Sequence, residues 1–431
     1  MFDREWRLKK QGLRRAPALV LGFFAFGLIL CWLIFTHSFA AYFARVAPDW
    51  ALWLDARQAT ALYSIADAQI NPDARPDAPQ APRHPQKKIE ELRKQAELAL
   101  LADPLSGKNY RLLGQLAELQ GSRKLAASAM VAAARHSLHE GYAAFWLMTR
   151  ALENKNFPSS AYYADVLLRS GTVLPDYVMP PLARMLESKG AGEQEVVKLL
   201  AQNPPWRPVF FGLIYNNLSD ASVPLKLLMD LRETAAPANV KELNAYQWFL
   251  INKRFVELAY YVWLQFLPPE DLEHAGFLFN GDFEKKPSGS PFDWQVPPVA
   301  NVTVDFVAKS EKDADRALLV GFSSGRAEFP GISQITMLTP GRYKLKGSYK
   351  SDLDGPRGVM WMVSCADNKI LGQSRHITGL TEDWAQFEFA FSVPEKGCPV
   401  QSLRLGLAAR SPSEELLSGE IWFDKLSIAS D

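Results

Sequence analysis

The chain has 431 residues, with 48 Lys and Arg against 47 Asp and Glu, so its net charge is +1. That length is enough for about two to four domains. The balanced charge argues against a nucleic-acid-binding protein, because phosphate contacts require a basic excess. An aromatic content of 12% also excludes a chain that is disordered throughout. Composition leaves open whether the protein is an enzyme, a binding protein or a scaffold.

Residues 1–48 are predicted to form a basic stub and a transmembrane helix. The first fifteen residues hold six Lys and Arg, and no Asp, Glu, Lys or Arg occurs from Ala16 to Ala44. A hydrocarbon core of about 30 Å needs roughly 20 apolar residues, and the positive-inside rule keeps the basic end in the cytoplasm. We therefore expect a single-pass, membrane-embedded protein of a bacterial inner membrane, with most of the chain in the periplasm.

A cleaved signal peptide is the alternative, because Ser38-Phe39-Ala40 is a small-x-small cleavage site. The apolar run is longer than the roughly 7–15 residues usual in such peptides, which favours an uncleaved anchor. Trp50 and Trp53 follow the run at positions suited to the membrane interface.

Residues 49–88 are predicted to be a short juxtamembrane helix and a Pro-rich linker. Prolines at 72, 76, 79, 82 and 85 forbid a helix and favour an extended spacer. The Pro-rich part is interpreted as a tether that holds the main body away from the bilayer.

Residues 89–270 are rich in Ala and Leu with apolar residues at helical spacing, and self-comparison suggests a period of 35. Small and apolar positions of one unit match those of the next, namely Tyr110, Leu113, Gly114 and Ala126 with Phe145, Met148, Thr149 and Ala161. This pattern resembles the tetratricopeptide repeat, although Thr149 departs from the usual small residue. The resemblance implies an α-solenoid of helix hairpins that binds other envelope or membrane proteins.

Trp206 and Arg207 lie among three prolines within this helical region. Trp and Arg are common interface anchors, so the pair could be an exposed site for partner docking. The equal alternative is a turn whose Trp plugs the solenoid.

Residues 271–431 contain short alternating, β-branched and aromatic segments bounded by Gly, Pro, Asp and Ser, which predict an antiparallel β-sandwich. The opening Asn280-Gly281-Asp282-Phe283-Glu284 and the closing Ile421-Trp422-Phe423-Asp424-Lys425-Leu426 resemble those of jelly-roll carbohydrate-binding modules. The resemblance implies a structural calcium ion held by Glu284 and Asp424, with Asp282 as a further ligand. Solvated or ion-paired acidic residues are the alternative.

Sugar rings stack on aromatic side chains, and Tyr349, Trp361 and Trp294 are the candidates for glycan binding. Strand alternation puts Trp361 on one face with Val359, Val363 and Cys365, so core packing is the competing interpretation. Trp384 and Trp422, inside strand motifs of the same resemblance, are expected to be core residues.

Cys365 and Cys398 are the two cysteines of the exported part, 33 residues apart in predicted strands. Cysteines in an oxidising compartment pair readily, so a disulfide is predicted; two buried small residues are the alternative.

The combination predicts a non-enzymatic periplasmic scaffold, accessory to exopolysaccharide assembly or export, whose solenoid binds proteins and whose sandwich contacts glycan. A second hypothesis is an assembly factor whose sandwich binds protein and no sugar; burial of all three candidate aromatics would favour it. A third is a glycan hydrolase or lyase. The G-x-S-x-G string at 321–325 lacks the helix that a nucleophile elbow needs, and no carboxylate pair stands out.

Overall fold

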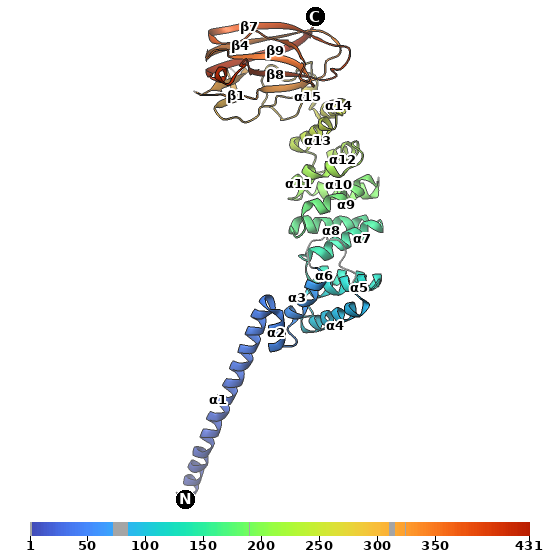
Figure 1. Cartoon of the computed structure of the whole chain (residues 1–431), viewed down its shortest axis with the longest axis vertical. Helices are drawn as coiled ribbons and strands as arrows, with labels where there is room; N and C mark the ends of the chain where they lie inside the picture. The colour runs from blue at the N-terminus through green and yellow to red at the C-terminus, as the bar shows by residue number, and fades with distance from the viewer. Residues whose placement is uncertain (1, 72–84, 189, 310–314, 324) are drawn as a thin grey trace. The chain divides into compact units, whose positions relative to one another are not determined.

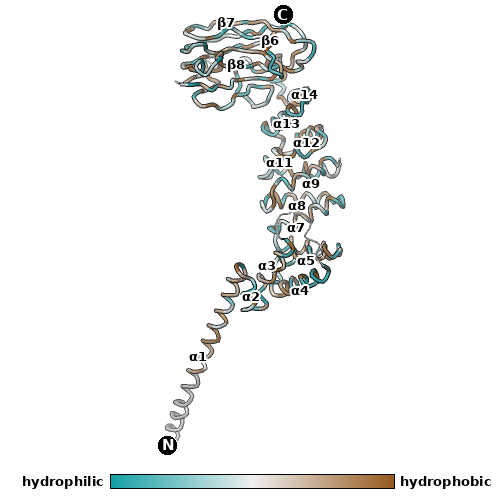
Figure 2. The backbone as a smooth tube through the Cα atoms, viewed as in Figure 1, coloured by the Kyte–Doolittle hydropathy of each residue, from teal (hydrophilic) through white to brown (hydrophobic). Residues whose placement is uncertain are grey.

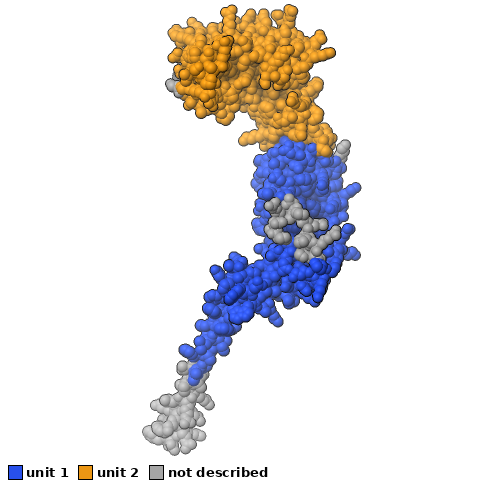
Figure 3. All heavy atoms as spheres, in the orientation of Figure 1, with its two compact units in different colours: residues 1–218 blue, residues 219–431 orange. Residues whose placement is uncertain are grey.

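The computed structural model describes residues 2–71, 85–188, 190–309, 315–323 and 325–431, with side chains from Leu21 onward. The chain divides into two compact units, Met1–Leu218 and Ser219–Asp431 (Figure 3). The division therefore falls about fifty residues before the boundary expected at 270. Multiple domains of α and β structure, as the sequence predicts, are confirmed.

The first unit is helical (Figure 1). Its elements are α1 (Phe2–Val46), α2 (Pro48–Leu54), α3 (Ala59–Ile70), α4 (Gln86–Ala102), α5 (Gly107–Leu119), α6 (Arg123–His136), α7 (Gly141–Glu153), α8 (Phe157–Ser170), α9 (Pro175–Glu187), α10 (Ala191–Ala201), α11 (Arg207–Leu213) and a short 3-10 helix (Ile214–Asn217). The stretch Leu21–Val46 of α1 is long and apolar enough to cross a membrane, and hydrophobic residues follow one another along it (Figure 2).

Helices α5 to α10 form consecutive hairpins with a spacing of 34 residues. Helices α5, α7 and α9 begin at 107, 141 and 175, and α6, α8 and α10 begin at 123, 157 and 191. The predicted period of 35 is therefore one residue too long, and the residue equivalent to Gly114 is Met148 rather than Thr149. Gly114 allows close packing of α5 on α6, since a Cβ there would lie 2.9 Å from Met130 Cε.

Helix α3 packs into this helical array. Ala66 and Ile70 of α3 share a buried cluster with Ile89 and Leu92 of α4 and with Leu112 of α5. The helix expected next to the membrane, before the linker, thus packs into the helical body. Most of the Pro-rich linker, 72–84, lies outside the described residues.

A buried arginine joins three helices of the first unit. The Arg111 guanidinium of α5 lies 2.9 Å from the Asp67 carboxylate of α3 and 3.3 Å from that of Glu140, which precedes α7. Arg111 also donates to Gln115 at 2.6 Å and contacts the Tyr63 hydroxyl of α3. Burial acts to lower the pKa of Arg111, but these partners outweigh it and the pKa is raised. The network holds α3 against α5.

Trp206 and Arg207 are buried, so the prediction of an exposed docking site is wrong. Trp206 is 4% exposed and its Nε1 donates to Asp165 Oδ1 at 2.8 Å. Arg207 is 2% exposed and donates to the Leu200 carbonyl at 2.9 Å. The two side chains fill the interior of the helical array, which agrees with the alternative interpretation. Their polar atoms form hydrogen bonds inside the unit.

The second unit combines short helices with two antiparallel sheets. Its helices are α12 (Val223–Arg232), α13 (Val240–Asn252), α14 (Val256–Phe266) and α15 (Pro269–Leu272). Its strands are β1 (Val302–Ala308), β2 (Arg316–Phe322), β3 (Ile332–Thr336), β4 (Gly341–Asp354), β5 (Val359–Cys365), β6 (Ile370–Gln373), β7 (Gly379–Val393), β8 (Gln401–Leu407) and β9 (Ser418–Ser430).

The strands form a five-stranded sheet, β1-β2-β9-β4-β7, and a four-stranded sheet, β3-β8-β5-β6. All named pairs are antiparallel, and the inner sides of the two sheets enclose one large apolar core. The expected antiparallel β-sandwich is confirmed. Cys365 at the end of β5 and Cys398 before β8 are joined as a disulfide, with Cα atoms 5.3 Å apart.

Helix α14 packs on the sandwich through aromatic rings. Trp263 lies 5.2 Å from Phe279 and 5.5 Å from Phe292, ring centre to ring centre. Gln247 of α13 accepts a hydrogen bond from Ser290 at 2.7 Å. These contacts explain why the helices after 218 belong to the same compact unit as the strands.

Candidate functional site

The outer side of the five-stranded sheet carries an exposed row of mixed aromatic and charged side chains. In β9, Ile421 and Phe423 are fully buried and face the core, so the alternation of the strand turns Trp422 outward. The antiparallel register places Trp422 between Leu319 of β2 and Lys350 of β4. Trp422 is half-buried and Lys350 is exposed.

Trp384 of β7 lies on the same outer side. Its neighbour Ala385 pairs with Tyr349 and points inward, so Trp384 points outward, and it is 41% exposed. The register of β4 against β7 shifts between Tyr349 and Ser351. This irregularity sets residues 382–384 opposite Lys350.

Lys309, directly after β1, crosses this side of the sheet. Its Nζ lies 5.4 Å from the centre of the Trp384 ring and forms ion pairs with the carboxylates of Asp424 and Asp315. Burial acts to lower the pKa of Lys309, but hydrogen bonds to the two carboxylates outweigh it and raise the pKa. Hydrogen bonds to Lys309 and to Glu284 hold the pKa of Asp315 below its usual value. The ammonium group is thus fixed beside the ring.

Further polar groups continue the row. Ser348 of β4 pairs with Asp424 on one side and with Gln386 of β7 on the other. We call the surface formed by these side chains the tryptophan face; its members are Trp384, Trp422, Lys350, Lys309, Asp424, Ser348 and Gln386. Flat aromatic rings beside hydrogen-bonding groups are what a sugar needs, because rings stack on its C–H faces and polar groups bind its hydroxyls.

Two of the three predicted glycan-binding aromatics are core residues, and for these the prediction is wrong. Trp294 and Trp361 are both fully buried, with ring centres 5.7 Å apart. Tyr349 is half-buried and faces inward, since it pairs with the buried Phe423 and its ring lies 6.2 Å from that of Phe387. Strand alternation turns Trp361 and Tyr349 toward the core, and Trp294 reaches the same core from the segment before β1, so a polysaccharide cannot stack on these rings.

The expected core positions of Trp384 and Trp422 are also wrong. Along β7, Phe387, Phe389 and Phe391 alternate with polar residues, and Trp384 falls in the polar phase. That signal is present in the sequence. Trp422 has the same signal, because Glu420 and Asp424 share its phase of β9 whereas Ile421 and Phe423 share the other.

The carboxylates expected to hold calcium do not present a calcium donor set. Asp424 is paired with the Lys309 ammonium, and Glu284 accepts the Arg316 backbone N–H at 2.9 Å. Burial, and a hydrogen bond to Asp315, raise the pKa of Glu284. Asp282 is exposed. Calcium needs six to eight oxygen ligands, and no metal-binding group of three acidic, His or Cys residues occurs in the described part of the chain. Calcium binding therefore stays a prediction, and the carboxylates of Glu284, Asp424 and Asp282 do not form the ligand set that it needs.

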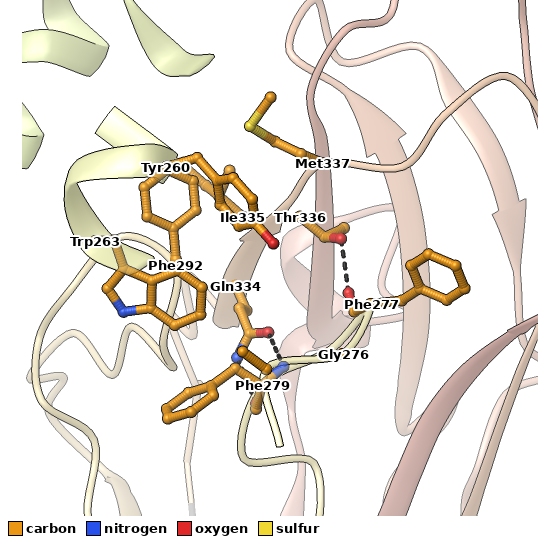
Figure 4. A pocket seen from close by; sticks show the side chains of 11 residues that line it. Tyr260, Trp263, Gly276, Phe277, Phe279, Phe292, Gln334, Ile335, Thr336 and Met337 are labelled. Atoms are coloured by element: carbon orange, nitrogen blue, oxygen red, sulfur yellow. Dashed lines mark hydrogen bonds between the residues drawn. The ribbon is translucent and has the colours of Figure 1, made fainter. Parts of the chain in front are cut away.

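A separate cavity of about 300 Å³ lies between α14 and β3. Figure 4 shows Tyr260 and Trp263 of α14 facing Ile335 and Thr336 of β3 across it. Two of its polar side chains already have backbone partners: Thr336 Oγ1 donates to the Phe277 carbonyl at 2.7 Å, and Gln334 pairs with the Phe279 backbone. The cavity is therefore part of the packing of helix on sheet, and the tryptophan face is the stronger candidate site.

No protein-family model matches the chain, and no curated protein matches it. The solved structures to which it is similar include a CBM4 module, with 16% identity and a TM-score of 0.27, covering 36% of this chain and 99% of that one. Another is the CBM22-1 xylan-binding domain of Paenibacillus barcinonensis Xyn10C, with 14% identity and a TM-score of 0.23, covering 35% and 91%. TmCBM61 in complex with β-1,4-galactotriose has 15% identity and a TM-score of 0.25, covering 36% and 98%.

Proposed function

We propose that this protein is a membrane-anchored periplasmic scaffold that assists exopolysaccharide assembly or export and contacts the glycan through its β-sandwich. The observation that carries the proposal is the tryptophan face. Trp384 and Trp422 are outward-facing rings on a rigid sheet, and Lys350, Ser348 and Gln386 offer hydrogen-bonding groups beside them. A shallow exposed surface of this kind suits a long polymer better than a small molecule, which is usually enclosed in a pocket.

The helical unit is assigned the role of docking proteins. Its hairpins recur every 34 residues, the length of a tetratricopeptide unit, and stacked hairpins of this type provide extended binding surfaces. No docking residue is assigned, since Trp206 and Arg207 are buried. The protein has no catalytic role in this proposal.

The proposed location follows from the N-terminal helix. Leu21–Val46 is long enough to span a bilayer, and the basic residues precede it, so the positive-inside rule directs the remaining chain outward. A disulfide between Cys365 and Cys398 suits the oxidising periplasm.

The test is retardation of the detergent-solubilised full chain in native gels that contain envelope polysaccharide. We expect the wild-type protein to be retarded and Trp384→Ala to lose most of the retardation. Leu416→Ala is the matched control, because Leu416 is 52% exposed in the same unit but lies outside the tryptophan face. Equal migration of wild type and Trp384→Ala, with or without polysaccharide, would reject glycan binding by this face.

The second candidate is an assembly factor whose sandwich binds protein and no sugar. Burial of Trp294 and Trp361 favours it, because two of the predicted sugar contacts are lost to the core. Co-purification in mild detergent separates the two functions. Under this alternative, Trp384→Ala removes a co-purifying protein and leaves migration in polysaccharide gels unchanged.

A further inference from the structure

Helix α2 folds back along the C-terminal end of α1 (Figure 1). Ala44 of α1, Ala51 of α2 and Ala61 of α3 are each fully buried in one small cluster. Alanine at all three positions lets the helix backbones approach closely, as small residues do at helix contacts in membranes. The reversal at Ala47 therefore returns the chain along α1 instead of leading it away.

The contacts at the end of α2 show how far the chain returns. Leu54 and Asp55 lie beside Leu33, Ile34 and His37 of α1. His37 Nδ1 is 3.8 Å from Asp55 Oδ2. A helix of seven residues is about 10 Å long, so α2 runs back over the last turns of α1.

That level coincides with the expected boundary of the hydrocarbon. Leu21–Val46 contains 26 residues, about 39 Å of helix, whereas the hydrocarbon core is about 30 Å thick. The uncharged run begins earlier, at Ala16. About 20 residues from there complete the crossing near residue 36, and the remainder of α1 emerges among the headgroups. Helix α2 packs on this emerging part, and its C-terminal end reaches the last turn of the crossing beside Leu33 and Ile34.

The exposed surface of α2 is aromatic. Trp50 is 64% exposed, with its ring centre 6.3 Å from that of Phe43 of α1, and Trp53 is 79% exposed. Tyr42 of α1 is 65% exposed. Tryptophan and tyrosine concentrate at membrane interfaces, where the ring is among apolar groups and its polar atom reaches water. A cluster of such rings next to a spanning helix fits the lipid surface that this helix crosses.

We propose that α2 is an interfacial helix whose Trp50 and Trp53 insert into the headgroup region of the outer leaflet. The inference rests on the proposed membrane anchoring by α1, and its partner is the lipid of the same bilayer. Because α3 follows α2 and packs on α4 and α5 through Ala66, Ile70 and the Arg111 network, the helical array is seated at the membrane surface. The Pro-rich segment comes later in the chain and is no spacer between bilayer and body.

The test uses a fluorescent label whose quenching reports depth in proteoliposomes of phosphatidylethanolamine and phosphatidylglycerol. Full-length protein is labelled with NBD at native Cys31, or at Trp53→Cys, Asp49→Cys or Leu125→Cys in a Cys31→Ser background. The lipid carries a nitroxide either near the headgroup or near the end of the acyl chain. Asp49 is exposed on α2 and its replacement keeps both tryptophans, whereas Leu125 is exposed on the helical array and serves as the control.

We expect labels at 53 and 49 to lose fluorescence mainly with the headgroup nitroxide, the label at 31 mainly with the chain-end nitroxide, and the label at 125 with neither. If the label at 31 is quenched but those at 53 and 49 are not, α2 does not enter the interface, although α1 still spans the membrane. If 31 is not quenched either, the anchor itself is refuted and the proposed function fails with it.

Discussion

The two sides of the five-stranded sheet use the same kinds of residue for opposite purposes. On the inner side, Phe423 meets Trp361 of the other sheet at 5.3 Å between ring centres, and both are fully buried. One residue away, Trp422 faces outward beside Lys350, and Trp384 shares that side. The phase of a strand, rather than the identity of the ring, therefore decides whether an aromatic residue stabilises the fold or is available to bind.

The largest expected effect is on the inner side. Trp361→Ala should lower the free energy of unfolding of the second unit by about 3–5 kcal/mol, because it leaves a cavity in a closed core. The indole N–H of Trp361 has no hydrogen-bond partner among the described residues, so the loss is one of packing. Calorimetry of the detergent-solubilised full chain measures it. Trp384→Ala is the control on the outer side of the sheet. A comparable loss of stability in that variant would show that Trp384 stabilises the fold as much as a core residue does.

Reduction of the Cys365–Cys398 disulfide tests the inner side in a second way. The bridge closes a loop of 33 residues, so its loss should cost about 2–4 kcal/mol. Urea unfolding with and without reductant gives the difference. Below its melting temperature, the reduced protein should still be retarded in polysaccharide gels, since Cys365 ends a strand of the other sheet and not of the sheet that carries the tryptophan face. Two free thiols in the unreduced, unfolded protein would show that the bridge does not form.

Lys309→Met probes the polar part of the outer side. Asp424 is only 2% exposed, and without its ammonium partner a buried charge is left unpaired. We expect a loss of about 1–3 kcal/mol in the free energy of unfolding. The double variant Lys309→Met with Asp424→Asn should recover much of it, because it removes the charge as well as its partner. A double variant no more stable than the single one would show that the pair does not act as a unit.

The pH dependence of the same cluster should be smaller still. Hydrogen bonding to Lys309 holds the pKa of Asp315 below its value in the unfolded chain, about 3.9. Its contribution to stability is therefore present above pH of about 4 and is lost as the pH falls through the lowered pKa. We compare melting temperatures at pH 5 and pH 3, about one unit above and below the unfolded pKa. The melting temperature of wild type should fall more over this interval than that of Asp315→Asn. Asp352→Asn, on the same sheet but outside the tryptophan face, should behave as wild type.

Much of the fold can be predicted from local pattern, because alternation and helical spacing act within a few residues. The sandwich, the helix hairpins and the apolar span of α1 follow in this way. The predicted period differs from the observed one by one residue, since in an Ala-rich sequence neighbouring positions such as Ser160 and Ala161 are both small and both buried. The inclusion of α12 to α14 in the sandwich unit depends on contacts such as Trp263 with Phe279, which no local pattern reveals.

The candidate site is less predictable than the fold. Alternation along β7 and β9 is enough to predict that Trp384 and Trp422 point outward, since Gln386 shares the phase of Trp384 and Glu420 that of Trp422. The pairing of Lys309 with Asp424 joins residues 115 positions apart and exists only once the five strands are assembled. Burial of Trp206 and Arg207 likewise depends on Asp165 and Leu200, partners supplied by other helices.

The central claim is that glycan binds on the outer side of the five-stranded sheet, and hydroxyl-radical footprinting of the full chain tests it most directly. In the free protein, Trp384 and Trp422 should be oxidised, and Trp294 and Trp361 should be protected by the core. Adding envelope polysaccharide should protect Trp384 and Trp422 and leave the other two unchanged. Unaltered oxidation of Trp384 and Trp422 at saturating polysaccharide, or protection confined to the helical unit, would contradict the account.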